Sequence, residues 1–392
     1  MKVDKSKWAE TAFAEIATSQ LGKTLDANKN KGLPYPYLCA ANIGMGYFNL
    51  SNVKEILLDD SELEKYLVRK GDLLICEGGD SGRCAIWESE DPIYYQNALH
   101  RVRFNDDIHN KFIMYYLHYY KKVGIIDKLS HGQTIKHFTQ KGLSKLSFRM
   151  PTISEQKGIA SELDAIQTMI DGYKAHISDF DELAKSLFLD TLGDPVINEK
   201  KWQIKSLSSL CNKMSTGPFG SMLHKSDYVV EGIPSVNPQN IKGSKVVIDG
   251  IAKVSYQKAE ELSKYYLKEN DIILARRGDL SKCAIITPKE QGWLCGTGSF
   301  FLHIEEVLPI VFYYQFTSKS IQKHLLEKSI GATMPNLNQG ILSKLMIPVP
   351  PIDIQQKFAS QIEAIDKQKA ILCEQLADAE QLMAERMQYY FS

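Results

Sequence analysis

The chain has 392 residues, of which 44% are hydrophobic and 24% are charged, with 47 basic and 47 acidic side chains. This is ordinary globular composition, long enough for two or three domains, and it excludes a disordered chain, a collagen-like repeat and a disulfide-stapled miniprotein. No apolar run approaches the roughly 20 residues that span a bilayer, and the seven cysteines include no C-x-x-C pair, so we expect neither a membrane protein nor a zinc ribbon, but buried thiols in a reducing cytoplasm.

Residues 1–152 predict a mixed α/β domain. Their short apolar runs are rich in β-branched and aromatic residues and are broken by Gly, Pro, Asn and Asp. Residues 73–76 and 83–87 read as two strands joined by a Gly-rich turn, so we expect a hairpin there. Residues 110–122 read as a short aromatic-rich helix.

Residues 153–193 predict one long amphipathic helix that begins after Pro151 and ends at a Gly-Asp-Pro stop. Apolar or small residues recur along it at alternating spacings of four and three, which is typical of a coiled-coil seam. The seam of this first helix includes Ile159, Leu163, Ile166, Ile170, Tyr173 and Ile177.

Residues 194–351 repeat the first domain, and residues 352–392 repeat the helix, at a constant offset of 199 positions. The hairpin recurs at residues 272–286, and a second aromatic-rich helix is expected at residues 308–319. Lys369 interrupts the second seam once. The other seam residues are Phe358, Ile362, Ile365, Leu372 and Leu376.

These elements predict an α+β fold with two homologous mixed α/β domains and two long helices. An amphipathic helix cannot bury its seam alone, so the two helices are expected to pair. Pairing in opposite directions would make an antiparallel coiled coil with pseudo-two-fold symmetry and would place the domains at opposite ends of a rod.

Charge is unevenly distributed along the chain. Residues 154–192 carry a net charge of −5 and residues 353–391 a net charge of −3, so the remainder carries about +8. Basic domains suit a polyanionic partner such as double-stranded DNA. Modest positive charge is also compatible with an ordinary solvated surface.

The sequence lacks the motifs that catalysis on nucleic acids would require. A nuclease would need clustered carboxylates for metal ions, yet Asp80 and Asp279 each stand alone in a glycine turn. No G-x-x-x-x-G-K-[ST] phosphate loop occurs, and no [DN]-P-P-[YF] motif for methylating an exocyclic amine. We therefore expect no catalytic residue, no metal site and no cofactor in this chain.

Two polar loops in each copy carry residue types that read base edges or phosphates. The hairpin tip at residues 77–83 recurs at residues 276–282, where its chemistry changes from acidic to strongly basic. A second loop at residues 131–137 recurs at residues 330–336. The candidate DNA-binding residues are Glu77, Asp80, Ser81, Arg83, Gln133, Thr134, Lys136, Arg276, Arg277, Ser281, Lys282, Thr333 and Asn336.

In the order and duplication of these parts, the chain resembles the specificity (S) subunits of type I restriction-modification enzymes. The resemblance rests on two domains that each lead through P-x-I-x-x-Q (Pro151 to Gln156, and Pro350 to Gln355) into a coiled-coil helix. The Gly132-x-Thr134 and Gly331-x-Thr333 loops and the Leu-Gly-Asp-Pro segment at residues 192–195 also fit.

The resemblance implies that each domain is a target recognition domain reading one half of a split, asymmetric DNA site. It implies that the helices set the spacing between half-sites and dock two methyltransferase subunits, which two restriction subunits join. S-adenosylmethionine, ATP and Mg²⁺ would then belong to those partners. The alternatives are a coiled-coil scaffold that does not read DNA and, with less support, a DNA methyltransferase in its own right.

Overall fold

The computed structural model describes residues 3–26, 30–132, 136–328 and 336–392. The chain folds into two compact units. Unit 1 is formed by residues 1–174 with 373–392, and unit 2 by residues 175–372. Each unit contains one mixed α/β head, which we name head 1 (residues 3–152) and head 2 (residues 194–351), and a segment of each long helix.

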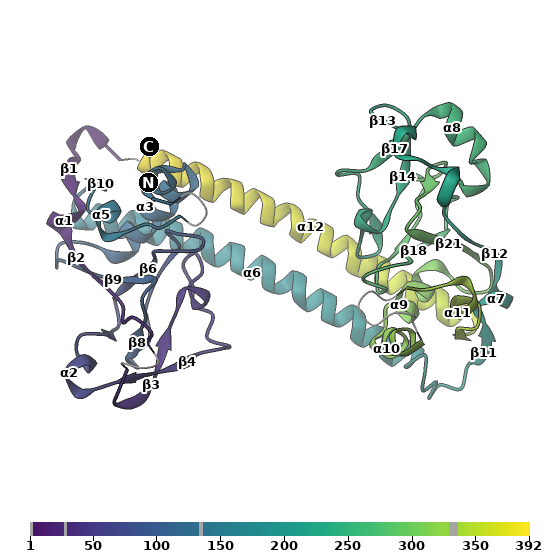
Figure 1. Cartoon of the computed structure of the whole chain (residues 1–392), viewed down its shortest axis with the longest axis horizontal. Helices are drawn as coiled ribbons and strands as arrows, with labels where there is room; N and C mark the ends of the chain where they lie inside the picture. Colours follow the sequence, from purple (N-terminus) through teal and green to yellow (C-terminus); the bar gives the residue numbers. More distant parts are fainter. Residues whose placement is uncertain (1–2, 27–29, 133–135, 329–335) are drawn as a thin grey trace. The chain divides into compact units, whose positions relative to one another are not determined.

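Head 1 is built on strands of three to six residues apart from one shorter strand (Figure 1). The strands are β1 (Ala9–Ala12), β2 (Ala17–Leu21), β3 (Leu33–Leu38), β4 (Lys54–Leu58), β5 (Leu67–Val68), β6 (Leu73–Cys76), β7 (Cys84–Ile86), β8 (Ile93–Tyr95), β9 (Leu99–Phe104) and β10 (Ser147–Met150). The order β2-β9-β6-β7 makes an antiparallel sheet, and the order β4-β3-β8-β5 makes a mixed sheet in which β3 and β8 run parallel. Strand β1 pairs with β10.

The predicted hairpin of head 1 is confirmed. Strand β6 pairs antiparallel with β7, with Leu73 opposite Ile86 and Ile75 opposite Cys84. All of β6 and β7 is buried, which explains why both strands are continuous apolar runs. The helices of head 1 are α1 (Phe13–Ile16), α2 (Asp60–Leu63), α3 (Asn110–Lys122), α4 (Ile125–Leu129) and α5 (Gln140–Leu143), and α3 has the predicted bounds.

Head 2 repeats this arrangement. Its strands are β11 (Gln203–Ser206), β12 (Cys211–Thr216), β13 (Tyr228–Val229), β14 (Ile233–Val236), β15 (Ile241–Lys242), β16 (Lys245–Val246), β17 (Ala252–Val254), β18 (Ile272–Ala275), β19 (Cys283–Ile285), β20 (Leu294–Cys295), β21 (Ser299–Ile304) and β22 (Met346–Val349). The order β12-β21-β18-β19 matches the antiparallel sheet of head 1, and β14 runs parallel to β20 in the order β13-β17-β14-β20. Strand β11 pairs with β22, as β1 does with β10.

The helices of head 2 are α7 (Leu207–Leu210), α8 (Tyr256–Glu261), α9 (Pro309–Thr317), α10 (Lys319–Lys328) and α11 (Gln339–Ser343). The helix expected at residues 308–319 is therefore α9, and it ends two residues early. Ser318 adopts an extended conformation between α9 and α10 and breaks the helix there.

The predicted long helices are α6 (Ile153–Leu192) and α12 (Ile352–Phe391). Thr152 and Glu155 exchange hydrogen bonds in a capping box at the start of α6. Gly193, with φ of +78°, takes the left-handed conformation that ends it. At about 1.5 Å per residue, 40 helical residues are about 60 Å long.

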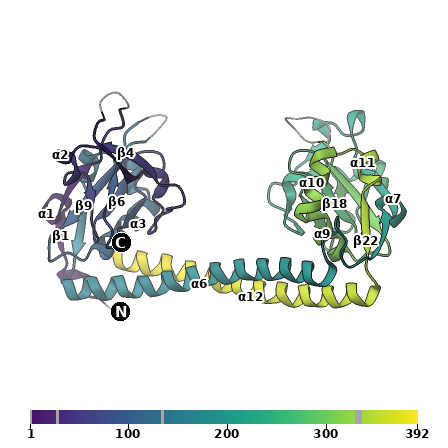
Figure 2. The same ribbon diagram turned by 90° about the horizontal axis from the view of Figure 1, so that it is seen from below.

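In unit 1 the two long helices run antiparallel (Figure 2). Glu162 pairs with Arg386, and Lys174, further along α6, pairs with Glu380, which is earlier in α12. The predicted seam residues Ile159, Leu163, Ile166 and Ile170 are buried, whereas Tyr173 and Leu376 are partly buried. The end of α12 enters the core of head 1 through Met387, Tyr390 and Phe391.

In unit 2 the helices are again antiparallel, because Asp181 pairs with Lys369 and Phe188, further along α6, contacts the ring of Phe358. Phe358, Ile362 and Ile365 are buried, and Ile177 and Leu372 are partly buried. The ion pair with Asp181 explains how Lys369 occupies a seam position. The predicted fold class, two homologous mixed α/β heads with an antiparallel pair of long helices, is confirmed.

All seven thiols are free. Cys76, Cys84, Cys283 and Cys295 are buried as expected, and Cys39 and Cys211 are partly buried. The expectation is wrong for Cys373, which is exposed because it follows Leu372 on α12 and points away from the seam.

Candidate nucleic-acid interface

In head 1 the backbone joins the two polar loops that the sequence singled out. Phe138 donates its N–H to the carbonyl of Glu77 over 2.7 Å, at the base of the hairpin tip. His131 and His137 close the second loop by exchanging two backbone hydrogen bonds of 2.9 and 2.8 Å. Lys136 is exposed on this loop, whereas Gln133 and Thr134 lie outside the described residues.

Head 2 brings the corresponding segments together in the same way. Leu337, whose position matches Phe138, donates its N–H to the carbonyl of Arg276 over 2.9 Å. Arg277 and Asn336 form an isolated antiparallel bridge. Thr333 lies outside the described residues. Each head therefore holds its hairpin tip against the described end of its second loop, and we call this pair of segments the loop cluster of the head.

The tip of head 1 is closed by interactions within the head. Lys121 of α3 donates to the carboxylate of Asp80 and to the carbonyl of Ser81, both over 2.7 Å. Ser81 is buried, and its hydroxyl lies 3.4 Å from that of Ser130. Asp80 is exposed but neutralised by Lys121, so the tip presents little net charge.

Arg83 is held inside head 1 rather than pointing to solvent. Its guanidinium donates to the carbonyls of Ile43, Ala40 and Asp80 over 2.8, 3.1 and 3.2 Å. Lys282 occupies the same repeat position in head 2 and donates to the carbonyl of Pro238 over 3.0 Å. Both side chains thus brace the tip against the preceding segment.

The tip of head 2 is open and basic. Arg277 is exposed, and Asp279 accepts hydrogen bonds from the backbone and hydroxyl of exposed Ser281 rather than from a lysine. Arg276 is partly buried, and its Nε has no hydrogen-bond partner among the described residues. The Oδ1 of Asn336, in the neighbouring segment, is buried and unpaired in the same sense. The exposed side chain of Arg277 at this basic tip is suited to contacts with a nucleic acid.

A buried polar residue beneath each loop cluster was missed by the sequence reasoning. In head 1 the Nε2 of His100 lies 3.1 Å from the carbonyl of Phe138. Burial lowers the pKa of His100, so the ring is neutral at pH 7. In head 2 the hydroxyl of Ser299 donates to the carbonyl of Val236 over 3.2 Å. His100 lies in β9, which also carries Arg101 and Arg103, and Ser299 is the first residue of β21, so no regular apolar pattern marks either residue in the sequence.

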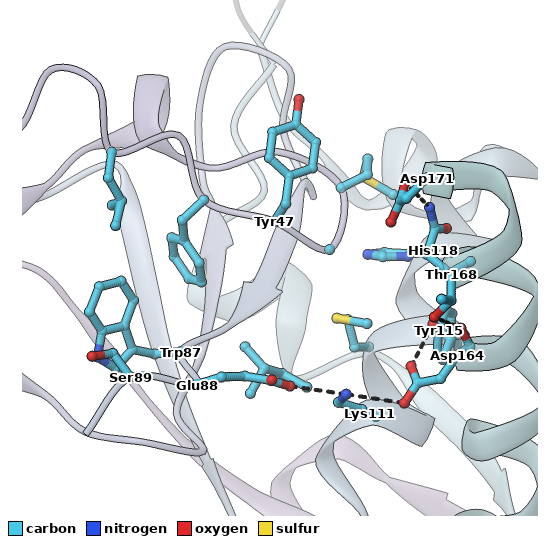
Figure 3. Close-up of a pocket in the computed structure, with 17 residues that line it drawn as sticks. Tyr47, Trp87, Glu88, Ser89, Lys111, Tyr115, His118, Asp164, Thr168 and Asp171 are labelled. Carbon is cyan, nitrogen blue, oxygen red and sulfur yellow. Dashed lines mark hydrogen bonds and ion pairs between the residues drawn. The ribbon is translucent and has the colours of Figure 1, made fainter. Parts of the chain in front are cut away.

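Unit 1 also contains a groove of about 730 Å³ between head 1 and α6, shown in Figure 3. Aromatic residues Tyr47, Phe48 and Trp87 line the side of the head. Lys111 of α3 lies 3.0 Å from a carboxylate oxygen of Glu88 and 3.1 Å from one of Asp164.

Three side chains complete the electrostatics of the groove. Tyr115 donates its hydroxyl to Asp164 over 2.7 Å. Burial lowers the pKa of His118 to about 4, so its ring is neutral at pH 7. Asp171 adds a further carboxylate. With three carboxylates and one lysine the lining has a net charge of −2 at pH 7, which repels DNA phosphates.

Unit 2 has a smaller groove of about 350 Å³ at matching positions of the repeat. Its lining residues Ile310, Glu363, Asp366, Lys367 and Ala370 each lie 199 positions after a lining residue of the first groove. The second groove is more apolar, because Ile310 and Ala370 stand where the first has Lys111 and Asp171. The constant offset of the repeat therefore relates the two grooves to each other.

A sequence model described as the type I restriction modification DNA specificity domain matches residues 5–178 and, a second time, residues 199–381. The chain belongs to this family. The two matches follow the two copies of the repeat, and the resemblance seen in the sequence is confirmed.

The relatives in the family that this chain resembles are specificity subunits, and the similarity extends over most of their length. The type I restriction enzyme EcoBI specificity subunit of Escherichia coli is 21% identical over 329 residues, which cover 77% of this chain and 68% of the relative. The MjaVIII specificity subunit of Methanocaldococcus jannaschii is 21% identical over 357 residues, covering 85% and 79%. These relatives support DNA recognition and support neither the scaffold nor the free-standing methyltransferase.

Solved structures of the family share the fold. The S subunit of a type I restriction-modification system from M. genitalium has a TM-score of 0.58 at 16% identity and covers 100% of this chain and 98% of that one. A chain from a structure on complex assembly and conformational transition of the type I R-M system has a TM-score of 0.62 at 14% identity, with coverages of 98% and 97%.

No cluster of three or more His, Cys, Asp or Glu side chains in the described residues is placed to hold a metal ion. Within the same ranges, no helix combines the length and hydrophobicity needed to cross a membrane.

Proposed function

We propose that this specificity subunit reads a split, asymmetric DNA target, with head 1 and head 2 each reading one half. The observation that carries the proposal is the pair of loop clusters, which share one frame and differ in chemistry. A neutralised tip in head 1 and an open basic tip in head 2 are suited to different base sequences. A repeat with identical tips would instead favour a symmetric target.

The distribution of charge supports the assignment of the heads to DNA. The long helices carry a net charge of −8, and the rest of the chain about +8. Binding to phosphates releases counterions, so we expect affinity for DNA to fall steeply with salt.

The test begins with the methylated positions in the native host genome, which would give a split motif. A duplex carrying that motif should bind the chain, with its methyltransferase partner present, at least about 1,000-fold more tightly than a scrambled duplex. Replacing residues 77–83 by residues 276–282 should alter recognition of one half-site and leave the other unchanged. Equal binding of motif and scrambled DNA would overturn the proposal, and an unchanged motif after the exchange would remove the tips from the reading surface.

The proposal assigns the chemistry to partner subunits in the cytoplasm. Two methyltransferase subunits would use S-adenosylmethionine, and two restriction subunits would use ATP and Mg²⁺. The isolated chain should then show no methyl transfer and no DNA cleavage, whichever of these is added. Turnover by a preparation shown to be free of partners would contradict this assignment.

The two grooves support docking of the methyltransferase subunits at repeat-equivalent places on the long helices. Their acidic rims disfavour DNA and favour a segment with cationic and apolar side chains. Asp171→Lys reverses a charge in the first groove and should remove one partner copy at limiting concentration. Native mass spectrometry counts the copies, and Asp190→Lys, elsewhere on α6, is the control. Two retained copies in Asp171→Lys would place docking elsewhere.

A further inference from the structure

One glutamine in each copy joins the start of a long helix to its head. Gln156 of α6 is 2% exposed and Gln355 of α12 is 1% exposed. Each is the last residue of a P-x-I-x-x-Q motif, and the two positions are 199 residues apart. A fully buried amide needs partners for its carbonyl and its NH₂ group.

Gln156 connects three backbone segments of unit 1. Its Oε1 accepts the N–H of His109, the residue that precedes α3, over 2.8 Å. Its Nε2 donates to the carbonyl of Pro151, at the end of β10, over 3.0 Å, and to that of Asp107 at 3.5 Å. The side chain therefore ties the first turn of α6 to both the last strand and the aromatic helix of head 1.

Gln355 makes the same connections in unit 2. Its Oε1 accepts the N–H of Leu308, which precedes α9, over 2.7 Å. Its Nε2 donates to the carbonyls of Pro350 and Glu306 over 2.8 and 2.9 Å. Because Leu308 and Pro350 match His109 and Pro151 in the repeat, the same joint occurs twice in a chain whose tips have diverged.

We propose that Gln156 and Gln355 are positioning residues that lock each head onto its long helix and so set the interval at which the half-sites are read. The inference rests on the proposed function, since an interval matters only if both heads read one DNA. A buried amide fixes direction as well as distance, because it holds one donor and two acceptors, drawn from two separate segments, at once. An apolar side chain of equal volume would fill the space but leave the joint free to pivot.

The experiment uses Gln156→Met and Gln355→Met, which keep length and volume and remove the three hydrogen bonds. Each variant, assembled with its methyltransferase partner, is tested on duplexes carrying the mapped half-sites at the native interval and at intervals one base pair shorter and longer. We expect the preference for the native interval to fall at least about tenfold in each variant, an energy change of about 1.4 kcal/mol. The half-site sequences that are recognised should stay the same.

A matched control and a second measurement separate positioning from general damage. Gln381→Met alters a glutamine of α12 whose amide donates to Glu385 in the next turn of the same helix, and this variant should keep the full interval preference. Hydrogen exchange should quicken at His109 in Gln156→Met and at Leu308 in Gln355→Met, and remain unchanged elsewhere.

The outcomes distinguish this inference from the function on which it rests. If the wild-type complex binds no split motif in preference to scrambled DNA, the proposed function fails. If it does, but the variants keep the wild-type interval preference, or lose affinity equally at all three intervals, then the glutamines do not set the interval and the inference is overturned.

Discussion

Heads 1 and 2 share a frame and differ where they meet solvent. The strand order of the antiparallel sheet, the brace formed by Arg83 or Lys282 and the backbone bond between the two loops are the same in both. The exposed ends differ, since Asp80 is neutralised by Lys121 whereas Asp279, its repeat equivalent, accepts hydrogen bonds from Ser281. The comparison teaches that a buried brace constrains a loop without fixing its exposed chemistry, so recognition can change while the fold does not.

The largest expected effect tests whether both units depend on the ends of the long helices. Phe391 is buried against Phe112, Tyr116 and Tyr119. Phe391→Ala should lower the free energy of unfolding of unit 1 by about 3–5 kcal/mol, because it leaves a cavity in the core. Leu192→Ala, at the repeat-equivalent position, should likewise lower the free energy of unfolding of unit 2. Denaturant unfolding followed by hydrogen exchange shows which unit loses stability. Destabilisation of unit 2 by Phe391→Ala, or of unit 1 by the Leu192 variant, would contradict the assignment of these residues.

The next effect separates the brace from the reader. Arg277→Ala should weaken binding to the cognate duplex by about 1–3 kcal/mol and change stability by less than about 0.5 kcal/mol. Arg83→Ala should instead lower the free energy of unfolding of unit 1 by about 1–3 kcal/mol, since it leaves buried carbonyls unpaired. Binding titrations and denaturant unfolding of both variants check this pattern. If Arg277→Ala lowered stability and Arg83→Ala weakened DNA binding instead, Arg83 would be the DNA-contacting residue and Arg277 the structural one.

A pH dependence distinguishes unit 1 from unit 2. Burial alone would raise the pKa of Glu162, but hydrogen bonds to its carboxylate, including those from Arg386 and Tyr390, outweigh burial and lower the pKa to about 2. The stabilisation is therefore complete above the ordinary pKa of 4.5 and is lost as the pH falls from about 4.5 to 2. We expect a loss of about 1–2 kcal/mol in unit 1 after allowing for solvent screening.

Position 361, the repeat equivalent of Glu162, is already a glutamine. Unit 2 should therefore lack this acid-sensitive contribution, and Glu162→Gln should make the acid unfolding of unit 1 less steep. Unfolding measured between pH 2 and pH 6 checks both statements. An unchanged slope in Glu162→Gln would show that another group controls the acid response.

The smallest effect concerns the interrupted seam. Lys369 stands where the first copy has buried Ile170, and it pairs with Asp181. Lys369→Ile should change the free energy of unfolding of unit 2 by less than about 1 kcal/mol, because an exposed ion pair contributes little and the new apolar contact offsets its loss. The salt dependence of unfolding should also weaken. A loss above about 2 kcal/mol would mean that the ion pair is essential to the seam.

The periodic parts of this fold were predictable from the sequence. The four-three spacing predicted both long helices, and the apolar runs predicted the hairpins β6-β7 and β18-β19. Burial imposes a regular pattern of apolar residues on these elements. Continued past Ile177, the same spacing predicts seam positions at 180, 184 and 187, whereas Phe188 is more deeply buried than Leu187. A straight helix drifts from a 3.5-residue repeat, which shifts the buried face by one position.

The candidate site was predictable only in part. Residue type and repetition identified the loops. They did not show that Arg83 bonds to backbone carbonyls of head 1 or that Ser81 is buried there. Those contacts join residues some 40 positions apart, and no local pattern encodes such distances. The grooves and the role of Gln156 escaped for the same reason, since their partners come from separate segments of the chain.

The packing of Phe391 against α3 has a consequence for how the protein is made. Head 1 leaves the ribosome before head 2, yet its core includes residues of α12 that are synthesised after all of unit 2, whose residues are contiguous from 175 to 372. Unit 2 can therefore fold while translation continues, and the earlier head must wait for the final turns of α12. A chain broken off during synthesis would expose an unfinished apolar surface on head 1, which marks it for the proteases that remove incomplete products.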